Sequence, residues 1–278
     1  MSFNIAVCIK PVPDPSHYDK ITIHPVHKTI NREGIPTIIN PVDKNAIEAA
    51  LQVKEQWGGK VTVITMAPPS AEENLREALA MGVDEAVLLT DRAFAGADTW
   101  ATSYTLAQGL KKTGNFDLIF TGTESADGAT SQVPAQLAQW LEISHLWNVQ
   151  QFDITNKEEL KAQMKIENGY IEYALKLPAL LAVSRECNKP RYTTIMGVMK
   201  AKKKPLTTWT ANDLDLNKDF IGLKGSPTQP GDIYTPELGR KGQELKGEPE
   251  EIVLQLIQKL RAAGLNLESW NVCAVGRE

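Results

Sequence analysis

The chain has 278 residues and a formal net charge of −4, from 30 basic and 34 acidic side chains. This balance excludes a strongly basic nucleic-acid-binding protein, so we expect no nucleic acid partner. Hydrophobic residues make up 42% and charged residues 23% of the chain, which is typical of a globular protein with a sizeable core. No segment approaches the roughly 18 consecutive apolar residues of a membrane helix, so we expect no membrane insertion.

From the start to about residue 141, short apolar segments rich in β-branched residues alternate with amphipathic segments. This alternation is typical of an α/β fold in which crossover helices join parallel strands. The carboxyl ends of such strands meet at one rim, where open α/β sheets bind ligands. The expected strands are Ile5–Ile9, Val61–Met66, Ala86–Leu89 and Leu118–Thr121.

Each expected helix has its own start or stop signal. Residues 40–43 suit a helix start, with an N-cap asparagine, a proline at the first helical position and an acidic residue in the first turn. Ser70 and Glu73 have the spacing of a capping box, and that helix should end before a glycine. A third helix is expected over about 98–113, and a fourth carries apolar residues at helical spacing over 133–141.

After residue 145 the pattern changes. A hairpin is expected from Leu160–Ile166 and Ile171–Leu175, and the apolar run Leu177–Val183 should add a buried strand. Residues 213–249 are rich in Gly, Pro, Asp and Lys, which favours an arm lying on another surface. The segment Glu250–Ala263 is amphipathic and predicts a last helix.

Cysteine and histidine patterns argue against a metal centre. The three cysteines lie far apart and form no C-x-x-C pair, which predicts a reduced, cytoplasmic protein; they are Cys8, Cys187 and Cys273. The apolar N-terminal segment is too short for the core of a signal peptide. Three clustered histidines lack a helical or thiolate frame, so we expect a solvated loop rather than a metal site. These histidines are His17, His24 and His27.

Several active-site signatures are absent from the sequence. It has no G-x-G-x-x-G after the first strand, no G-x-x-x-x-G-K-[ST], no H-E-x-x-H and no G-x-S-x-G. A common dehydrogenase, NTPase, zincin or hydrolase is therefore disfavoured. No residue stands out as a general acid, general base or nucleophile, so we assign no catalytic residue.

The segment 122–133 follows an expected strand, is small and polar, and opens a helix. Such a loop presents backbone N–H groups and hydroxyls to an anion such as a phosphate, although ordinary strand-to-helix loops use the same residue types. Its position at the rim of the parallel strands favours nucleotide binding. Because Asp43 puts a negative charge at a neighbouring helix start, we expect ribose or base there and phosphate at 122–133.

The segment Arg191–Lys204 combines an aliphatic centre, Ile195–Met199, with lysines at 200 and 202–204. A charged segment is commonly a solvated loop, but exposed apolar residues beside charge often mark a contact surface. The residues by themselves leave both interpretations open.

Taken together, these segments resemble one family, the β subunit of electron-transfer flavoprotein. The resemblance covers nearly the whole chain, and several motifs in the same order carry it. The motifs are VCIKPVPD near the start, NPVDKNAIEAA at 40–50, REALAMGVDEA at 76–86, GTESADGATSQV at 122–133, LKLPALLAV at 175–183 and PRYTTIMGVMKAKKK at 190–204.

The resemblance implies a doubly wound, mostly parallel, Rossmann-like α/β fold that binds an adenine nucleotide, with a C-terminal hairpin extension and a partner-wrapping arm. It implies a nucleotide-binding domain at 1–204, which includes a docking loop at 190–204, and an arm and helix at 205–278 that contact an α subunit. By position, the nucleotide would be bound by Cys8, Asn40, Pro41, Val42, Asp43, Met66, Gly122, Thr123, Glu124, Ser125, Asp127, Gly128, Ala129, Thr130, Ser131, Gln132 and Val133. The docking residues would be Arg191, Tyr192, Ile195, Met196, Met199 and Lys200, with Ile195 as the anchor.

The family also implies cofactors. The α subunit carries an FAD, and the subunit that this chain resembles holds either structural AMP, in simple carriers, or a second FAD, in electron-bifurcating members that use NADH and ferredoxin. Residues 127–133 resemble the bifurcating pattern D-G-D-T-A-Q-V, with Ala129 in place of an aspartate and Pro134 in place of a following glycine; residues 221–228 also resemble that branch. We expect the bifurcating branch, with the AMP-holding carrier as the alternative.

The implied partners are the α subunit and a flavin dehydrogenase of the acyl-CoA or hydroxy-acid type, with ferredoxin as a further electron carrier. The chain would then be part of an oxidoreductase complex that shuttles electrons. Two other classes stay open. One is a stand-alone nucleotide-binding module, and the other is a nucleotide-hydrolysing or ligating enzyme, which residues 10–13 disfavour because they are not a pyrophosphate-binding loop.

Overall fold

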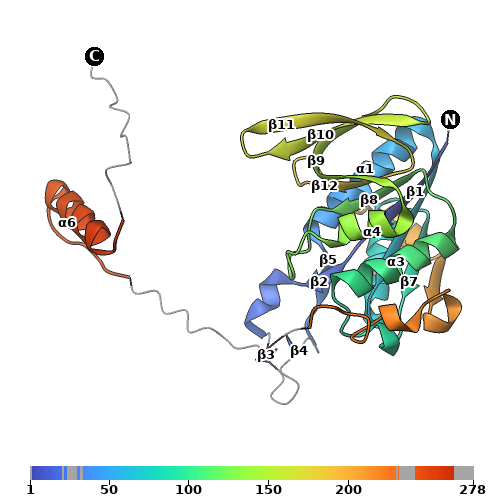
Figure 1. Ribbon diagram of the computed structural model, residues 1–278, viewed down its shortest axis with the longest axis horizontal. Coiled ribbons are helices and arrows are strands. Elements are labelled where there is room, and N and C mark those ends of the chain that lie inside the picture. The colour runs from blue at the N-terminus through green and yellow to red at the C-terminus, as the bar shows by residue number, and fades with distance from the viewer. Residues whose placement is uncertain are drawn as a thin grey trace. The chain divides into compact units, whose positions relative to one another are not determined.

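The computed structural model describes residues 2–20, 22–23, 30–31, 34–229, 231 and 242–265. Within these residues, nine strands form one sheet in the order β11-β10-β9-β12-β8-β1-β6-β7-β13 (Figure 1). The chain divides into two compact units, Met1–Ile233 and Tyr234–Glu278, and the sheet belongs to the first.

Most of the sheet is parallel, as predicted, and a hairpin extends it. The hairpin strands β10 (Glu159–Ile166) and β11 (Gly169–Lys176) are antiparallel to each other, and β10 is antiparallel to β9. The parallel strands are β1 (Phe3–Cys8), β6 (Gly59–Met66), β7 (Glu85–Leu89), β8 (Leu118–Gly122), β9 (Ser144–Ile154), β12 (Ala179–Val183) and β13 (Leu206–Trp209).

Helices cover both faces of the sheet (Figure 1). The helices α1 (Pro41–Trp57) and α2 (Glu72–Met81) pack on one face, against alternate residues such as Val7 and Phe120. The helices α3 (Thr99–Thr113) and α4 (Val133–Leu141) pack on the other, against Ile64 and Ile119. Because side chains alternate across each strand and both faces are covered, the central strands β1, β8 and β12 are buried almost throughout. This arrangement confirms the doubly wound α/β fold.

The direction in which the chain adds strands reverses between β1 and β8, and such a reversal is called a topological switch point. From β1 the chain adds β6 and then β7 on one side, and after α3 it returns to place β8 on the opposite side of β1. The helices that follow β1 and β8 therefore cover opposite faces, and open α/β sheets bind ligands at such a point, beyond the carboxyl ends of the strands.

Local signals located the helices but not all of their caps. The expected capping box at Ser70 and Glu73 is wrong, because Ser70 lies in the 3₁₀ segment Pro69–Ala71 and α2 begins at Glu72 without a side-chain cap. The glycine predicted to end α2 is Gly82, which has a φ of 135° and donates its N–H to the carbonyl of Leu79.

Several elements were not predicted from the sequence. The strand β9 carries two register shifts, against β10 and β12, which interrupt its two-residue period. The helix α5 (Ile195–Ala201) has only seven residues, and β13 has four. Since β13 pairs with β7, the sheet continues beyond the domain boundary expected after residue 204.

The second unit contains the helix α6 (Pro249–Ala262), close to the predicted segment, with exposed apolar residues such as Leu254 and Leu256. No helix in the described part of the chain is long and apolar enough to span a membrane. The remaining short elements are β2 (Pro11–Pro13) paired with β5 (Thr37–Ile39), β3 (Thr22–Ile23) paired with β4 (Ile30–Asn31), and the 3₁₀ segments Pro15–Lys20, Arg92–Phe94, Ala211–Asp213 and Lys218–Phe220.

Candidate functional site

The carboxylate of Asp43 joins three elements at the switch point. One oxygen, Oδ2, accepts a hydrogen bond of 2.7 Å from the backbone N–H of Lys10, just after β1. The other, Oδ1, accepts bonds from Asn40 Nδ2 at 3.0 Å and from the backbone N–H of Gly122 at 3.1 Å. We call these four residues the switch-point junction. They fix the start of α1 between the ends of β1 and β8.

Burial governs the charge of this carboxylate. The side chain of Asp43 is buried, and burial raises its pKa to about 7, although the hydrogen bonds from Asn40, Lys10 and Gly122 and the charge of Lys10 lower it. The residue also lies in the first turn of α1, where the helix dipole favours a negative charge. Asp43 therefore titrates close to neutral pH, unlike a surface aspartate.

Asn40 has a different role from the predicted one. Its side chain makes no capping bond to α1. Besides its bond to Asp43, Nδ2 donates to the carbonyl of Glu124 at 2.8 Å, and Oδ1 accepts from the N–H of Ala126 at 3.1 Å. Asn40 thus holds the first part of the loop 122–133 against the start of α1.

Lys10 is a site residue that the sequence analysis missed. Its Nζ donates to Asp127 Oδ1 at 2.6 Å and to Ser125 Oγ at 3.2 Å. The ammonium group therefore sits beside the predicted phosphate loop, and its backbone belongs to the switch-point junction. Its place directly after the first strand, at the rim where ligands bind, is the signal that could have identified it.

The second part of the loop exposes backbone donors at the start of α4. Ala129 and Ser131 adopt left-handed conformations, with φ of 47° and 55°. Ser131 Oγ donates to Glu124 Oε2 at 3.1 Å, while Gln132 Oε1 accepts from Thr99 Oγ1 at 2.9 Å. No acceptor among the described residues reaches the backbone N–H groups of 130–133. Such N–H groups at a helix start suit an anion.

The remaining predicted residues lie near the carboxyl ends of the central strands. Cys8 and Met66 end β1 and β6 on the face covered by α3 and α4, and Thr121 of β8 shares that face. The hydroxyl of Thr121 is buried and has no hydrogen-bond partner among the described residues. Burial, and to a smaller extent the charge of Asp43, raises the pKa of the Cys8 thiol, so it stays protonated. Pro41 and Val42 form the first turn of α1.

The predicted docking residues lie on α5 and just before it. Ile195 is 84% exposed, Met196 63% and Met199 64%, and Tyr192 is 88% exposed. A Cβ on Gly197 would lie 2.4 Å from the carbonyl oxygen of Ala80, so α5 lies close against α2. The helix therefore presents its apolar side chains to solvent.

The basic residues around α5 are not equivalent. Arg191 forms ion pairs with Glu48 and Glu55 of α1, and Lys204 Nζ donates to the carbonyls of Leu79 and Val83 at the end of α2. Lysines 200, 202 and 203 are exposed. A groove of about 410 Å³ lies beside α5, lined by residues of α2 and of 193–202.

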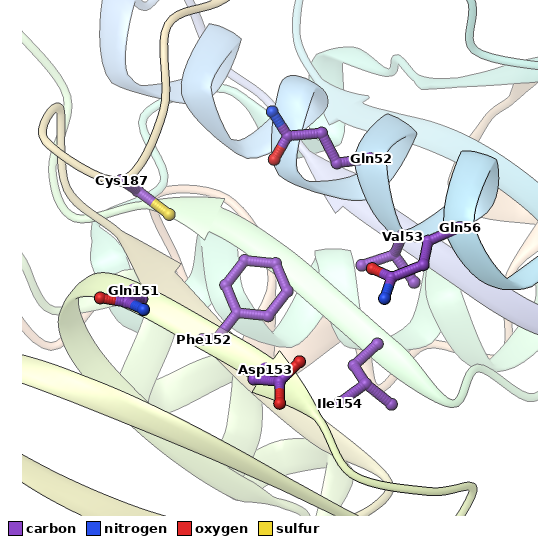
Figure 2. A pocket seen from close by; sticks show the side chains of 8 residues that line it. All are labelled: Gln52, Val53, Gln56, Gln151, Phe152, Asp153, Ile154 and Cys187. Carbon is purple, nitrogen blue, oxygen red and sulfur yellow. The ribbon is translucent and has the colours of Figure 1, made fainter.

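A second pocket, of about 130 Å³, lies between α1 and β9 (Figure 2). Gln52, Val53 and Gln56 line it from the helix, residues 151–154 line it from the strand, and Cys187 closes one side. Burial raises the pKa of Cys187 to about 11. None of the predicted nucleotide-binding residues lines this pocket.

Two predictions about metals and cysteines fall partly outside the described residues. His24, His27 and Cys273 are not among them. His17 lies in the 3₁₀ segment Pro15–Lys20, and Ser16 Oγ is 2.9 Å from its Nδ1. Within the described residues, no group of three or more potential ligands could hold a metal ion.

Comparisons with known proteins give the family. Residues 28–214, about two thirds of the chain, match the model of the electron transfer flavoprotein domain. The beta subunit of the electron transfer flavoprotein of Thermoanaerobacterium thermosaccharolyticum is 46% identical over 93% of this chain and 98% of its own length.

Two further relatives have other names. The CarD subunit of the caffeyl-CoA reductase–Etf complex of Acetobacterium woodii is 44% identical over 92% of this chain and 97% of its own length. The protein FixA of Bradyrhizobium diazoefficiens is 42% identical over 83% of this chain and 81% of its own length. With these matches spanning nearly the whole chain, the protein belongs to the electron transfer flavoprotein family, among its beta subunits.

Proposed function

We propose that this chain pairs with an electron transfer flavoprotein α subunit that carries an FAD, and that it binds an adenine nucleotide at the switch-point junction. The heterodimer shuttles electrons between a flavin dehydrogenase and other carriers. The dehydrogenase is of the acyl-CoA or hydroxy-acid type.

The loop held by the switch-point junction supports nucleotide binding most directly. It combines the free N–H groups of 130–133 with the hydroxyls of Thr130 and Ser131, beside the ammonium group of Lys10. Gly122 has no room for a side chain, because a Cβ there would lie 2.4 Å from Asp43 Oδ1. These residues fit a phosphate-bearing nucleotide.

We further propose that the nucleotide on this subunit is FAD, as in bifurcating members of the family that use NADH and ferredoxin. The loop 127–133 supports this choice by its resemblance to the bifurcating pattern. Pro134 is compatible with it, because a proline in the first turn of α4 removes no intrahelical hydrogen bond. When bound, the isoalloxazine supplies the redox chemistry, and this chain's residues bind and orient it.

The exposed side chains of α5 support docking of the dehydrogenase. Ile195, Met196 and Met199 form an apolar tip, with Lys200 beside it. Apolar anchors contribute much of the affinity of an interface, while charges around them speed and orient the encounter.

Cofactor analysis of the heterodimer tests the proposal. The chain is co-expressed with its α subunit, the purified pair is denatured, and released FAD and AMP are quantified per heterodimer. Two FAD and no AMP are expected. One FAD with one AMP would make this a simple carrier whose nucleotide is structural, and the absence of any flavin would overturn the electron-transfer proposal. A Gly122→Ala variant, whose Cβ would lie 2.4 Å from Asp43 Oδ1, should disturb the junction and lose the nucleotide of this subunit while the α subunit keeps its FAD.

A further inference from the structure

Arg191 is held by two carboxylates of α1. Its Nε and Nη2 donate to the two oxygens of Glu48 at 2.7 and 3.0 Å, and its Nη1 and Nη2 donate to the two oxygens of Glu55 at 2.5 and 3.1 Å. Its backbone N–H also donates to Glu48, at 3.1 Å. Arg191 therefore uses both its side chain and its backbone to attach the chain to α1.

Glu48 is the buried member of this group. Its side chain is only 6% exposed, against 59% for Glu55. Burial alone would raise the pKa of Glu48, but the hydrogen bonds and charge of Arg191 outweigh it and lower the pKa. A buried carboxylate without its partner strongly destabilises the folded state, so the folded chain keeps Glu48 and Arg191 paired.

Further contacts secure the same segment at both of its ends. At its start, Asn45 Nδ2 donates to the carbonyl of Asn188 at 2.7 Å, and Asn188 Nδ2 donates to the carbonyl of Asn45 at 3.0 Å. At its end, Arg76 Nη1 donates to the carbonyls of Ala201 and Lys204 at 3.0 and 3.1 Å.

The helix between these ends cannot be stable by itself. It has seven residues, and helices this short need tertiary contacts in water. Its apolar side chains make few contacts with the rest of the molecule, since Ile195, Met196 and Met199 are mostly exposed. What holds it in place is the polar contacts at its ends, the N-cap from Thr194, the close approach of Gly197 to α2 and the one buried side chain, Ala201.

We infer that Arg191 and Glu48 are positioning residues, which hold α5 in the conformation that presents Ile195 and Met199 to the dehydrogenase. Arg191 does so without touching the partner, although its sequence position suggested a docking contact. The inference rests on the docking function proposed above. Holding α5 in place before docking removes the entropy loss of ordering it during docking, which strengthens binding.

The test compares six variants of the full heterodimer. They are Arg191→Gln, Arg191→Lys, Glu48→Gln, the double variant Arg191→Gln with Glu48→Gln, Ile195→Ala, and Arg185→Gln as a matched control. Arg185 is an exposed arginine near the start of the segment, and within the described residues it makes no ion pair. The first readout is hydrogen exchange of the backbone amides of 193–199. The second is the KM and kcat of electron transfer from a purified acyl-CoA dehydrogenase.

We expect faster exchange and a KM raised about tenfold in Arg191→Gln and Glu48→Gln, with kcat at saturation and bound nucleotide unchanged. The double variant should be no worse than either single variant, because both act through one pair. Arg191→Lys, which keeps the charge but cannot bridge both carboxylates, should lie between wild type and Arg191→Gln. Arg185→Gln should match wild type in both readouts.

Two results would overturn the inference. Unchanged exchange with a raised KM would make Arg191 a direct contact, and changed exchange with an unchanged KM would make the pair merely structural. Ile195→Ala in the same assay separates this inference from the docking function. If Ile195→Ala raises KM and Arg191→Gln does not, only positioning fails; if neither does, the proposed docking function fails.

Discussion

Two regions of the molecule, the loop 122–133 and the segment 188–204, are both attached to α1, but in different ways. At the start of α1, the buried carboxylate of Asp43 collects N–H donors from two strand ends and from Asn40. Further along the helix, Glu48 and Glu55 hold the guanidinium of Arg191. The first region is buried only where it joins the central strands, at 121–123, while the second ends in an exposed helix.

The difference fits the two proposed functions. A nucleotide site needs fixed donors, and the junction fixes the loop that carries them at the cost of a buried carboxylate. A helix proposed to dock exposes most of its apolar side chains, so it has little core of its own and depends on contacts with α1 and α2. One helix, α1, holds both regions through polar side chains on its otherwise apolar, buried face.

The largest expected effect is a pH dependence of stability that arises from Asp43 in the switch-point junction. The folded-state pKa of Asp43, about 7, lies above the ordinary 3.8 of an aspartate, so between these values the folded chain binds more protons than the unfolded chain. Protonation of Asp43 therefore increases the free energy of unfolding as the pH falls from 7 towards 4. The same contribution, about 4 kcal/mol in all, is lost as the pH rises again. The check is to measure unfolding free energies of wild type and Asp43→Asn by chemical denaturation across this range. Parallel pH profiles of the two proteins would contradict the prediction.

The next largest effect on stability is expected for Gly122→Ala, which adds a methyl group at the switch-point junction. In Gly122→Ala the new Cβ would lie 2.4 Å from Asp43 Oδ1 and 3.1 Å from Val42 Cβ. We expect the free energy of unfolding to fall by about 3 kcal/mol, together with loss of the bound nucleotide. Gly128→Ala is the matched control for the free energy of unfolding alone, because its Cβ would meet only Ser125 Oγ, at 3.3 Å, and Lys10 Nζ, at 3.8 Å. Equal effects of the two variants would mean that close packing at Gly122 is unimportant.

In the exposed helix α5, Ile195→Ala should weaken docking and change little else. The side chain is 84% exposed, so the free energy of unfolding should change by less than about 0.5 kcal/mol. Loss of an apolar anchor should weaken docking by about 2 kcal/mol, seen as a slower electron transfer from the dehydrogenase at subsaturating concentration. Bound cofactor should be unchanged. Equal transfer rates in variant and wild type would remove the anchor assignment.

The smallest effect is expected for Lys10→Gln. The ammonium group is partly exposed, so its ion pair with Asp127 contributes at most about 1 kcal/mol to stability. If it also contacts the phosphate, nucleotide affinity should fall severalfold, measured by equilibrium dialysis of the apo-heterodimer. Lys60→Gln, which removes an exposed lysine paired with Glu85 at the far end of β6, is the control and should leave affinity unchanged.

The sequence by itself determined the local elements and the family. The periods of apolar residues predicted β1, β6, β7 and β8, the helices α1 to α4 and the hairpin β10–β11, because each of these buries a regular set of side chains. The order of the motifs predicted the family. Three elements were missed because their sequences establish no period. The helix α5 has only seven residues and β13 only four, while β9 shifts its register against both of its neighbours.

Only the tertiary structure decided what the polar residues do. Asn40 looked like a helix cap, but its partners Glu124 and Ala126 lie 84 and 86 residues away in the sequence. Lys10 and Asp127 are 117 residues apart, and Arg191 and Glu48 are 143 apart. Apolar periodicity reports which face of an element is buried, whereas a hydrogen bond depends on which distant groups the fold brings within about 3 Å. For that reason the sequence indicated a candidate nucleotide loop and a candidate docking segment, and the fold determined how each is held.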